Sequence, residues 1–405
     1  MTGILEGIKV VDLSTYIAMP AATAMFADWG AEVIKVEPLG VAGEQSFPSQ
    51  PPPWSIRNTG GAGYLTMQMV NRNKKSLAVD LKKEAGIEVL HKLVRTADIF
   101  ASNLETSTIA KLKADYATLS KINPRLIYCV LTAYGRTGPD KDLRGGDYAA
   151  AWARSGAMHQ IGEPGSPLAM NLHGALDRTT GAYCAAGMAA ALWHREKTGQ
   201  GQEIEVCLYH SGVWFCAADI QMAALGMTPP KLQHREGVSF NPLWNAYRTK
   251  DNRWFQLQQF GLDWPAYCRA MERPDLEKDP RFASVETMRK HAEEIIVLLD
   301  GIFETRTLAE WERRFRENNV IYAPVATPAE VAADPQAQAA GFFADVQHPT
   351  LGKIKLVTTP VKFHQNPASV RTPAPQRGQD TELILMELGY SWEDIARLKE
   401  QEVVL

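Results

Sequence analysis

Residues 7–37 read GIKVVDLSTYIAMPAATAMFADWGAEVIKVE, and this stretch decides the fold. Residues 7–13 are a short run rich in β-branched side chains, which predicts a strand. A helix of small residues is expected from about Pro20 to Trp29, and a second strand from Glu32 to Glu37. Parallel strands need a crossover of this kind. The chain is therefore expected to open with a βαβ unit.

The same alternation continues downstream. Strands are expected at residues 76–81, 99–102 and 125–132, and a helix at residues 83–95. Repeated βαβ units predict a parallel sheet with helices on both faces, which is a doubly wound, Rossmann-like α/β domain. The loop after the first strand contains no G-x-G-x-x-G, so the dinucleotide fingerprint of this fold class is missing.

The sequence changes character near Pro242. Two short runs, 244–249 and 254–259, flank a polar KDNR turn and predict a β-hairpin. Helical periodicity then dominates residues 285–303 and 308–317. This mixture predicts a second, smaller α+β domain.

We therefore expect three segments along the chain. Residues 1–225 form the first part of the large α/β domain, and residues 226–330 form the small α+β domain. Residues 331–405 return the chain to the large domain. This last segment contains an extended connector at 358–378, rich in Pro, Thr, Gln and Arg, and ends in two short helices.

The composition excludes several classes of protein. The 405 residues carry 43 Lys and Arg against 46 Asp and Glu, a formal net charge of −3, so nucleic acid is not an expected partner. The N-terminus lacks the regions of a secretory signal, and the longest apolar run, 182–193, is shorter than the roughly 20 residues that span a bilayer. Five widely spaced cysteines favour reduced core thiols. We expect a cytoplasmic protein with no membrane partner and no bound metal.

The most informative segment is residues 174–201, GALDRTTGAYCAAGMAAALWHREKTGQG. Asp177 stands where a helix is expected to begin, so its carboxylate suits an ordinary N-cap. The same place suits a nucleophile, because amides at a helix N-terminus stabilise negative charge. With an ordinary pKa of about 3.9, the carboxylate is expected to stay ionised at neutral pH even after a rise of roughly two units. Spacing alone leaves both interpretations open.

This segment resembles the hallmark of the class III CoA-transferases, the formyl-CoA and carnitine-CoA transferase type. In that family an Asp, a polar pair and Gly precede a small-residue helix that ends in K-T-G-x-G. The resemblance covers nearly the whole chain, including the motifs GAEVIKVEP, NKKSLAVDLK, LTAYGRTGPD and GQDTELILMELGYS. It implies that Asp177 attacks an acyl-CoA to give a mixed anhydride and then an aspartyl-CoA thioester. It also implies an interlocked homodimer, with coenzyme A and acyl-CoA as substrates and no permanently bound cofactor.

The resemblance further implies which residues contact CoA, whose phosphates need local cations. The residues at these family positions are Ile17, Ala18, Lys82, Asn103, Leu104, Lys111 and Arg144. Arg72, Lys74 and Lys75 add positive charge nearby in the sequence. Pro38 stands where some relatives use Arg to hold the adenine.

Two further residues are expected to support the active site. Relatives carry a polar or acidic side chain near Asp147. Gly261 ends the stretch QQFG, residues 258–261, where formyl-CoA transferases have a run of glycines that closes over the site. This bulkier sequence suggests a different acyl group.

Two other functions remain open. An α-methylacyl-CoA racemase needs an acid/base pair that includes a His in a G-H-D context, but the position of that His is Gly146 here. A CoA-binding subunit without turnover is the second alternative, and retention of Asp177 in its full motif argues against it. Details such as ADWGAEVIKVE and CLYHSGVW look most like the transferases of amino-acid-fermenting anaerobes. These exchange CoA between an enoyl-CoA or aryl-acryloyl-CoA and a 2-hydroxy acid.

Overall fold

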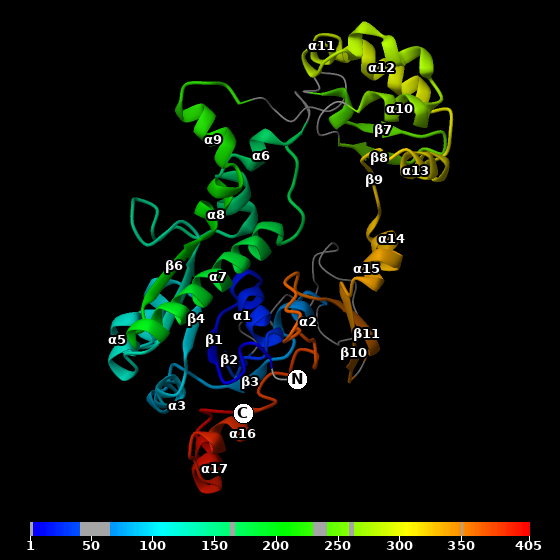
Figure 1. Ribbon diagram of the computed structural model, residues 1–405. Coiled ribbons are helices and arrows are strands. Elements are labelled where there is room, and N and C mark those ends of the chain that lie inside the picture. The colour runs from blue at the N-terminus through cyan, green and yellow to red at the C-terminus, as the bar shows by residue number, and fades with distance from the viewer. Residues whose placement is uncertain (1–2, 41–64, 163–166, 230–240, 259–262, 350) are drawn as a thin grey trace. The chain divides into compact units, whose positions relative to one another are not determined.

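The computed structural model describes residues 3–40, 65–162, 167–229, 241–258, 263–349 and 351–405 (Figure 1). Its internal contacts divide the chain into two compact units. Unit 1 comprises Met1–Met158, Met170–Met227 and Gln336–Leu405, and unit 2 comprises His159–Ala169 and Thr228–Pro335. Both units are discontinuous in sequence. The sequence pattern did not predict that residues 159–169 belong to unit 2.

Unit 1 is built on a parallel six-stranded sheet, which confirms the predicted fold class. Its strands are β1 (Lys9–Leu13), β2 (Glu32–Glu37), β3 (Lys75–Ala78), β4 (Ile99–Ser102), β5 (Ile127–Thr132) and β6 (Glu203–Cys207). They lie in the order β3-β2-β1-β4-β5-β6, the order of a Rossmann-like sheet. The order reverses between β1 and β4, where Leu13 pairs with Ser102. In such sheets ligands bind at the carboxyl ends of the strands beside this reversal.

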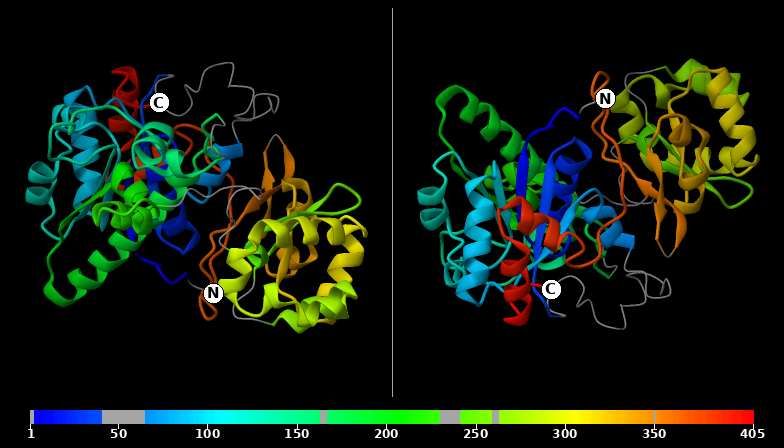
Figure 2. Two further views of the ribbon diagram at one scale, coloured as in Figure 1. Left: turned by 90° about the horizontal axis from the view of Figure 1, so that it is seen from above. Right: turned by 90° about the horizontal axis from the view of Figure 1, so that it is seen from below.

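Helices cover both faces of this sheet. One face packs against α3 (Glu84–Arg95), α5 (Tyr116–Ile122), α16 (Thr381–Glu387) and α17 (Trp392–Glu400). The other packs against α1 (Ala18–Asp28) and α7 (Ala175–Thr198). Alternate residues of a strand point to opposite faces, so Val11 lies in the core with α3 and α16, while its neighbour Val10 is buried on the other side. Figure 2 shows the red C-terminal helices beside the cyan helices, with the green α7 across the sheet from them.

The C-terminal part of the chain extends the edge of the sheet at β3. The N–H of Ser76 donates to Asp380 Oδ2 at 2.8 Å, and the N–H of Asp380 donates to the Ser76 carbonyl at 3.0 Å. Residues 358–380 contain no helix or strand, as expected of an extended connector. An antiparallel hairpin of β10 (Phe343–His348) and β11 (Gly352–Val357), which the sequence analysis missed, comes before it.

Unit 2 packs helices against a three-stranded antiparallel sheet, so the predicted hairpin is confirmed. The strands β7 (Ala246–Arg248), β8 (Trp254–Leu257) and β9 (Tyr322–Pro324) lie in that order. The helices are α10 (Trp264–Met271), α11 (Val285–Lys290), α12 (Ala292–Phe303) and α13 (Leu308–Glu317). Phe255 is central to an aromatic core, with ring centroids 5.0 Å from Phe303 and 5.2 Å from Phe315. The periodic segment 285–303 is two helices instead of one, because the backbone leaves helical geometry at His291.

Shorter helices complete the described part of the chain. They are α2 (Leu65–Asn71), α4 (Thr106–Lys111), α6 (Ala157–Gln160), α8 (Leu208–Phe215), α9 (Ala217–Ala224), α14 (Pro328–Ala333) and α15 (Pro335–Ala339). Among the residues described, no helix combines the length and the apolar character that crossing a membrane requires.

Candidate active site

Asp177 lies in the first turn of α7, but it does not cap the helix. The N-cap is Gly174, whose φ of 64° is left-handed, and Asp177 is the third helical residue. The predicted N-cap position of Asp177 is therefore wrong. Glycine is required at the true cap, because a Cβ on Gly174 would also come within 2.8 Å of Ile17 Cδ1. The Asp177 carboxylate is left available for another role.

Asp147, at the start of the π-helix Asp147–Ala153, lies near the first turn of α7. The backbone N–H groups of Gly174, Leu176 and Asp177 oppose the rise that burial causes in the pKa of its carboxyl. Both carboxylate oxygens accept from Asn171 Nδ2, at 3.2 Å each. Asp147 is only 6% exposed, so these polar groups replace the water that its charge would otherwise attract. The sequence analysis expected Asp147 near the site but did not identify Asn171 as its partner.

The electrostatic setting of Asp177 differs from the expectation of a fully ionised carboxylate. Burial, together with the nearby charge of Asp147, raises the pKa of Asp177 to about 7, while the Arg178 cation acts in the opposite direction. At pH 7 the carboxylate is therefore not fully ionised. The rise exceeds the roughly two units allowed for in the sequence analysis, with burial as its largest cause and the charge of Asp147 as the next. Such a perturbed acid marks a candidate functional group.

Two ring side chains lie beside this pair of acids. Burial and the charges of Asp147 and Asp177 raise the pKa of Tyr148, so its hydroxyl stays protonated at neutral pH. Burial and Arg178 lower the pKa of His173, which keeps its imidazole neutral at pH 7. The rings of Tyr148 and His173 are 6.5 Å apart. Tyr148 belongs to the π-helix that begins at Asp147, and His173 lies in the turn just before α7.

The predicted apolar CoA contacts, Ile17 and Ala18, lie against α7 close to Asp177. Ile17 is buried and caps α1, with its Cδ1 beside Gly174. Farther along α7, a Cβ on Gly181 would come within 2.5 Å of the Ala18 carbonyl oxygen. Small residues thus let the N-terminal ends of α1 and α7 touch, which explains the composition of both helices.

Asn103 joins the loops at the reversal of strand order. The Thr15 N–H donates to Asn103 Oδ1 at 2.8 Å, and Asn103 Nδ2 donates to the Thr15 carbonyl at 2.7 Å. The next residue, Leu104, packs against the core beneath α3. The loop after β1, which leads into Ile17, is therefore fastened to the loop after β4. The structure brings Ile17, Ala18, Asn103 and Leu104 to the edge where a ligand is expected.

The predicted cationic contacts lie on the surface of unit 1. Lys82 follows β3 and is exposed, and Lys111 is the exposed last residue of α4. Arg144 forms an ion pair with Glu105 at 2.7 Å, with its side chain 85% exposed. These side chains stand around the loops that follow β3 and β4, and no contact joins the three cations among the residues described.

Three other basic residues that the sequence placed near the site serve the fold instead. The fully buried Lys74 pairs with Asp12 at 2.8 Å, and the buried Arg72 pairs with Asp28 at 2.7 Å. Lys75 contacts Glu32 at 2.5 Å. Each of these charges is matched by a carboxylate inside unit 1. The sequence suggested that these three residues add positive charge near CoA. In the structure their charge is balanced within unit 1 instead.

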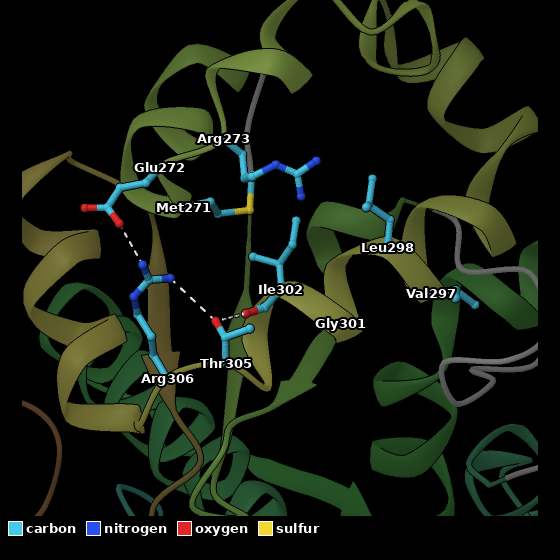
Figure 3. Close-up of a pocket in the computed structure, with 9 residues that line it drawn as sticks. All are labelled: Met271, Glu272, Arg273, Val297, Leu298, Gly301, Ile302, Thr305 and Arg306. Atoms are coloured by element: carbon cyan, nitrogen blue, oxygen red, sulfur yellow. Dashed lines mark hydrogen bonds and ion pairs between the residues drawn. The ribbon is translucent and has the colours of Figure 1, made fainter.

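A pocket of about 500 Å³ lies in unit 2, between the end of α10 and α12 (Figure 3). Both of its arginines are already engaged: Arg306 Nη2 donates to Glu272 at 2.6 Å, and Arg273 pairs with Asp275 at 2.5 Å. None of the predicted site residues lines this pocket. Gly261 lies outside the described residues, so its role stays a prediction. The groups with chemistry suited to acyl transfer are those around Asp177.

Comparisons with known proteins agree on one family. Residues 5–381 match the model of CoA-transferase family III. The chain is 33% identical to the (R)-2-hydroxy-4-methylpentanoate CoA-transferase of Clostridioides difficile, over 99% of both chains. It is also 33% identical to the cinnamoyl-CoA:phenyllactate CoA-transferase of Clostridium sporogenes, over 100% of this chain and 98% of the relative. A CAIB/BAIF family protein from Brucella suis shares its structure with a TM-score of 0.83 and 27% identity, over 96% of this chain and 100% of the other.

Proposed function

The chain belongs to CoA-transferase family III, and we propose that it moves CoA from an enoyl-CoA or aryl-acryloyl-CoA to a 2-hydroxy acid, with Asp177 as the covalent carrier. The observation that supports this most is the partly buried carboxylate of Asp177, with its raised pKa, in the first turn of α7. Within the described residues no hydrogen-bond donor occupies this carboxylate, so its lone pairs are not committed to another group and can attack a thioester carbon.

The transfer takes four balanced steps. The ionised Asp177 attacks the thioester carbonyl of the donor, forming a mixed anhydride and expelling the CoA thiolate. The thiolate then attacks the aspartyl carbonyl, which gives an aspartyl-CoA thioester and frees the donor acid. The acceptor carboxylate attacks this thioester and expels the thiolate again, and the thiolate finally attacks the acyl carbonyl of the new anhydride. This last step yields the product acyl-CoA and restores the Asp177 carboxylate.

The charge of Asp147 favours the covalent states of Asp177. While Asp177 is ionised, it shares a partly buried helix terminus with the charge of Asp147, and this repulsion contributes to its raised pKa. The anhydride and the thioester of Asp177 carry no charge, so acylation relieves the repulsion. A raised pKa also makes the ionised carboxylate a stronger nucleophile, at the expense of the fraction ionised at neutral pH.

The choice of a 2-hydroxy acid rests on two supports. Two relatives that match almost the full chain are named for 2-hydroxy acids with apolar side chains. On this chain, the buried Ile17 makes the surroundings of the first turn of α7 apolar. Apolar surroundings at this point favour an acid with an apolar body over a second carboxylate, which would be buried without a partner there.

A homodimer is proposed on the basis of exposed apolar surface in unit 1. Helix α9 has no buried residue, although it is mostly apolar. Trp214 and Phe215 of α8 are 66% and 55% exposed, and Leu225 after α9 is 77% exposed. Large apolar surface of this kind is usually covered by a partner. A second copy of the chain is the partner that the family resemblance implies.

The cellular setting that we propose is the cytoplasm. All five cysteines are free, and four of them are buried, which suits a reducing compartment. Coenzyme A and acyl-CoA enter the scheme as substrates, and every covalent step is carried by Asp177 without a permanently bound cofactor.

The decisive experiment is covalent labelling. Incubation with cinnamoyl-CoA or an enoyl-CoA, without an acceptor, is expected to add acyl or CoA mass at Asp177, and hydroxylamine is expected to release it. Asp177→Asn should take up no label. The matched control Asp142→Asn, at an exposed carboxylate, should label like the wild type. If the wild type gave no adduct and Asp177→Asn kept full exchange activity, the mechanism would be wrong. A panel of 2-hydroxy and dicarboxylic acceptors then decides the substrate.

A further inference from the structure

The carboxyl edge of the parallel sheet receives one cation from the C-terminal connector. Nη1 of Arg377 donates to the carbonyl oxygens of Leu39, at 3.3 Å, and Gly40, at 2.6 Å. These residues follow β2 immediately after Pro38. Arg377, far away in the sequence, thus stands where β2 ends.

The neighbouring Gly378 fixes this placement. Its N–H donates to Ser76 Oγ at 2.8 Å, and that hydroxyl in turn donates to the buried carboxylate of Glu37. Gly378 has a left-handed φ of 69°, and a Cβ on it would come within 2.9 Å of the Ala78 Cβ. The connector therefore packs closely over the ends of β2 and β3, and Arg377 is held there by more than its own contacts.

Arg377 and Lys82 have no carboxylate partner among the described residues, unlike some cations of this region. Arg144 is matched by Glu105 and Lys74 by Asp12. In the part of the chain that the structure describes, no carboxylate forms an ion pair with either Arg377 or Lys82. Arg377 adjoins the end of β2, and Lys82 follows the end of its neighbour β3. The carboxylates at this end of the sheet are engaged elsewhere, that of Glu37 by Ser76 Oγ and that of Asp80 by the Lys82 backbone N–H.

The fold class indicates which group of a ligand these two cations would bind. In doubly wound folds that bind NADP, an arginine accommodates the phosphate on the adenosine ribose. Coenzyme A carries such a phosphate at its ribose 3′ position. A guanidinium with one nitrogen on backbone carbonyls still has Nε and Nη2 to present to phosphate oxygens.

We propose that Arg377, assisted by Lys82, binds the 3′-phosphate of coenzyme A. This assignment rests on the proposed function, since it takes coenzyme A as the ligand. The C-terminal connector then contributes to substrate binding as well as closing the fold of unit 1. It also explains how the chain can bind this phosphate although the residue after β2, Pro38, carries no charge.

The test compares coenzyme A with 3′-dephospho-coenzyme A by titration calorimetry on the same protein. Arg377→Leu is expected to weaken the binding of coenzyme A about tenfold, which corresponds to about 1.4 kcal/mol. Binding of the dephospho form is expected to change less than about twofold, because the lost contact is missing there already. Arg377→Lys, which keeps the charge, should fall between the wild type and Arg377→Leu. Because both ligands are measured on one preparation, partial unfolding of a variant cancels in the ratio.

Arg371→Leu is the matched control. Arg371 lies in the same connector and also donates to a backbone carbonyl, that of Ala27, at 2.9 Å, but Ala27 belongs to the end of α1 that leads into β2. Its replacement should leave the ratio of the two affinities unchanged. An equal loss for both ligands in Arg377→Leu would overturn the assignment while leaving the proposed function in place. A wild type that binds neither ligand would overturn the proposed function and the assignment with it.

Discussion

The carboxylate of Asp147 lies near the first turn of the helix that carries Asp177, so two acids share one helix terminus. The backbone N–H groups of this turn favour the charge of Asp147, while that charge contributes to the raised pKa of the Asp177 side chain. The reactivity of Asp177 therefore depends on Asp147.

The rate of the first acyl transfer should depend on pH through Asp177. Only the ionised carboxylate attacks, so kcat/KM for the acyl-CoA donor should fall about tenfold per pH unit well below the pKa of about 7, and level off above it. Asp147→Asn removes the charge that raises this pKa. Its acid limb should therefore move to lower pH by roughly one unit. The pH profile of single-turnover labelling measures this, and an unmoved limb in Asp147→Asn would contradict the electrostatic coupling.

Asp177→Asn should make the protein more stable at neutral and alkaline pH. The folded pKa of Asp177, about 7, lies above the ordinary value of 3.8, so the stability it contributes is complete below about pH 4 and is lost as pH rises through 7. The shift sets an upper bound of about 4 kcal/mol, and partial exposure reduces it to roughly 1–3 kcal/mol. Denaturant unfolding at pH 4.5 and pH 8 measures the difference. The Asn variant should gain much more at the higher pH than at the lower, and the exposed control Asp142→Asn should gain at neither.

Gly181→Ala should separate α1 from α7. The added Cβ would meet the Ala18 carbonyl oxygen at 2.5 Å, and a backbone atom cannot move aside cheaply. We expect a loss of roughly 1–3 kcal/mol in the free energy of unfolding, together with weaker binding of acyl-CoA. Gly187→Ala, on the same helix, is the control, because its Cβ would meet only the Ile204 side chain at 3.2 Å. Since alanine favours a helix by up to about 1 kcal/mol over glycine, the control should be neutral or stabilising.

Lys74→Met and Lys82→Met should affect different properties. Lys74 is fully buried with Asp12, so its loss strands a buried carboxylate and should cost about 3–5 kcal/mol of unfolding free energy. Lys82 is exposed, and its loss should leave stability nearly unchanged but raise KM for acyl-CoA. Chemical denaturation and steady-state kinetics on both variants distinguish the two roles. Equal effects of the two substitutions on stability would refute the division between structural and ligand-binding lysines.

Local sequence patterns accounted for most of the fold. The runs rich in β-branched residues predicted β1, β2 and β5, since such side chains pack well on the pleated surface of a buried sheet. The polar KDNR turn predicted the pairing of β7 with β8. By contrast, β10 and β11 carry few β-branched residues and several charges, so their hairpin left little trace in the sequence. The break at His291 was missed because helical periodicity continues on both sides of it.

The sequence by itself determined the parallel α/β architecture, the family and the choice of Asp177, because these depend on short patterns and on a motif contiguous in the chain. Only the tertiary structure decided which residues far apart in the sequence lie together, at Asp177 and elsewhere in unit 1. Asp147 reaches the start of α7 from another segment, Lys74 is drawn into the core by Asp12, and Arg377 arrives at β2 from the C-terminal connector. A pKa, a cap or a cationic site depends on which charges lie within a few ångströms, and folding sets those distances between residues that the sequence keeps far apart.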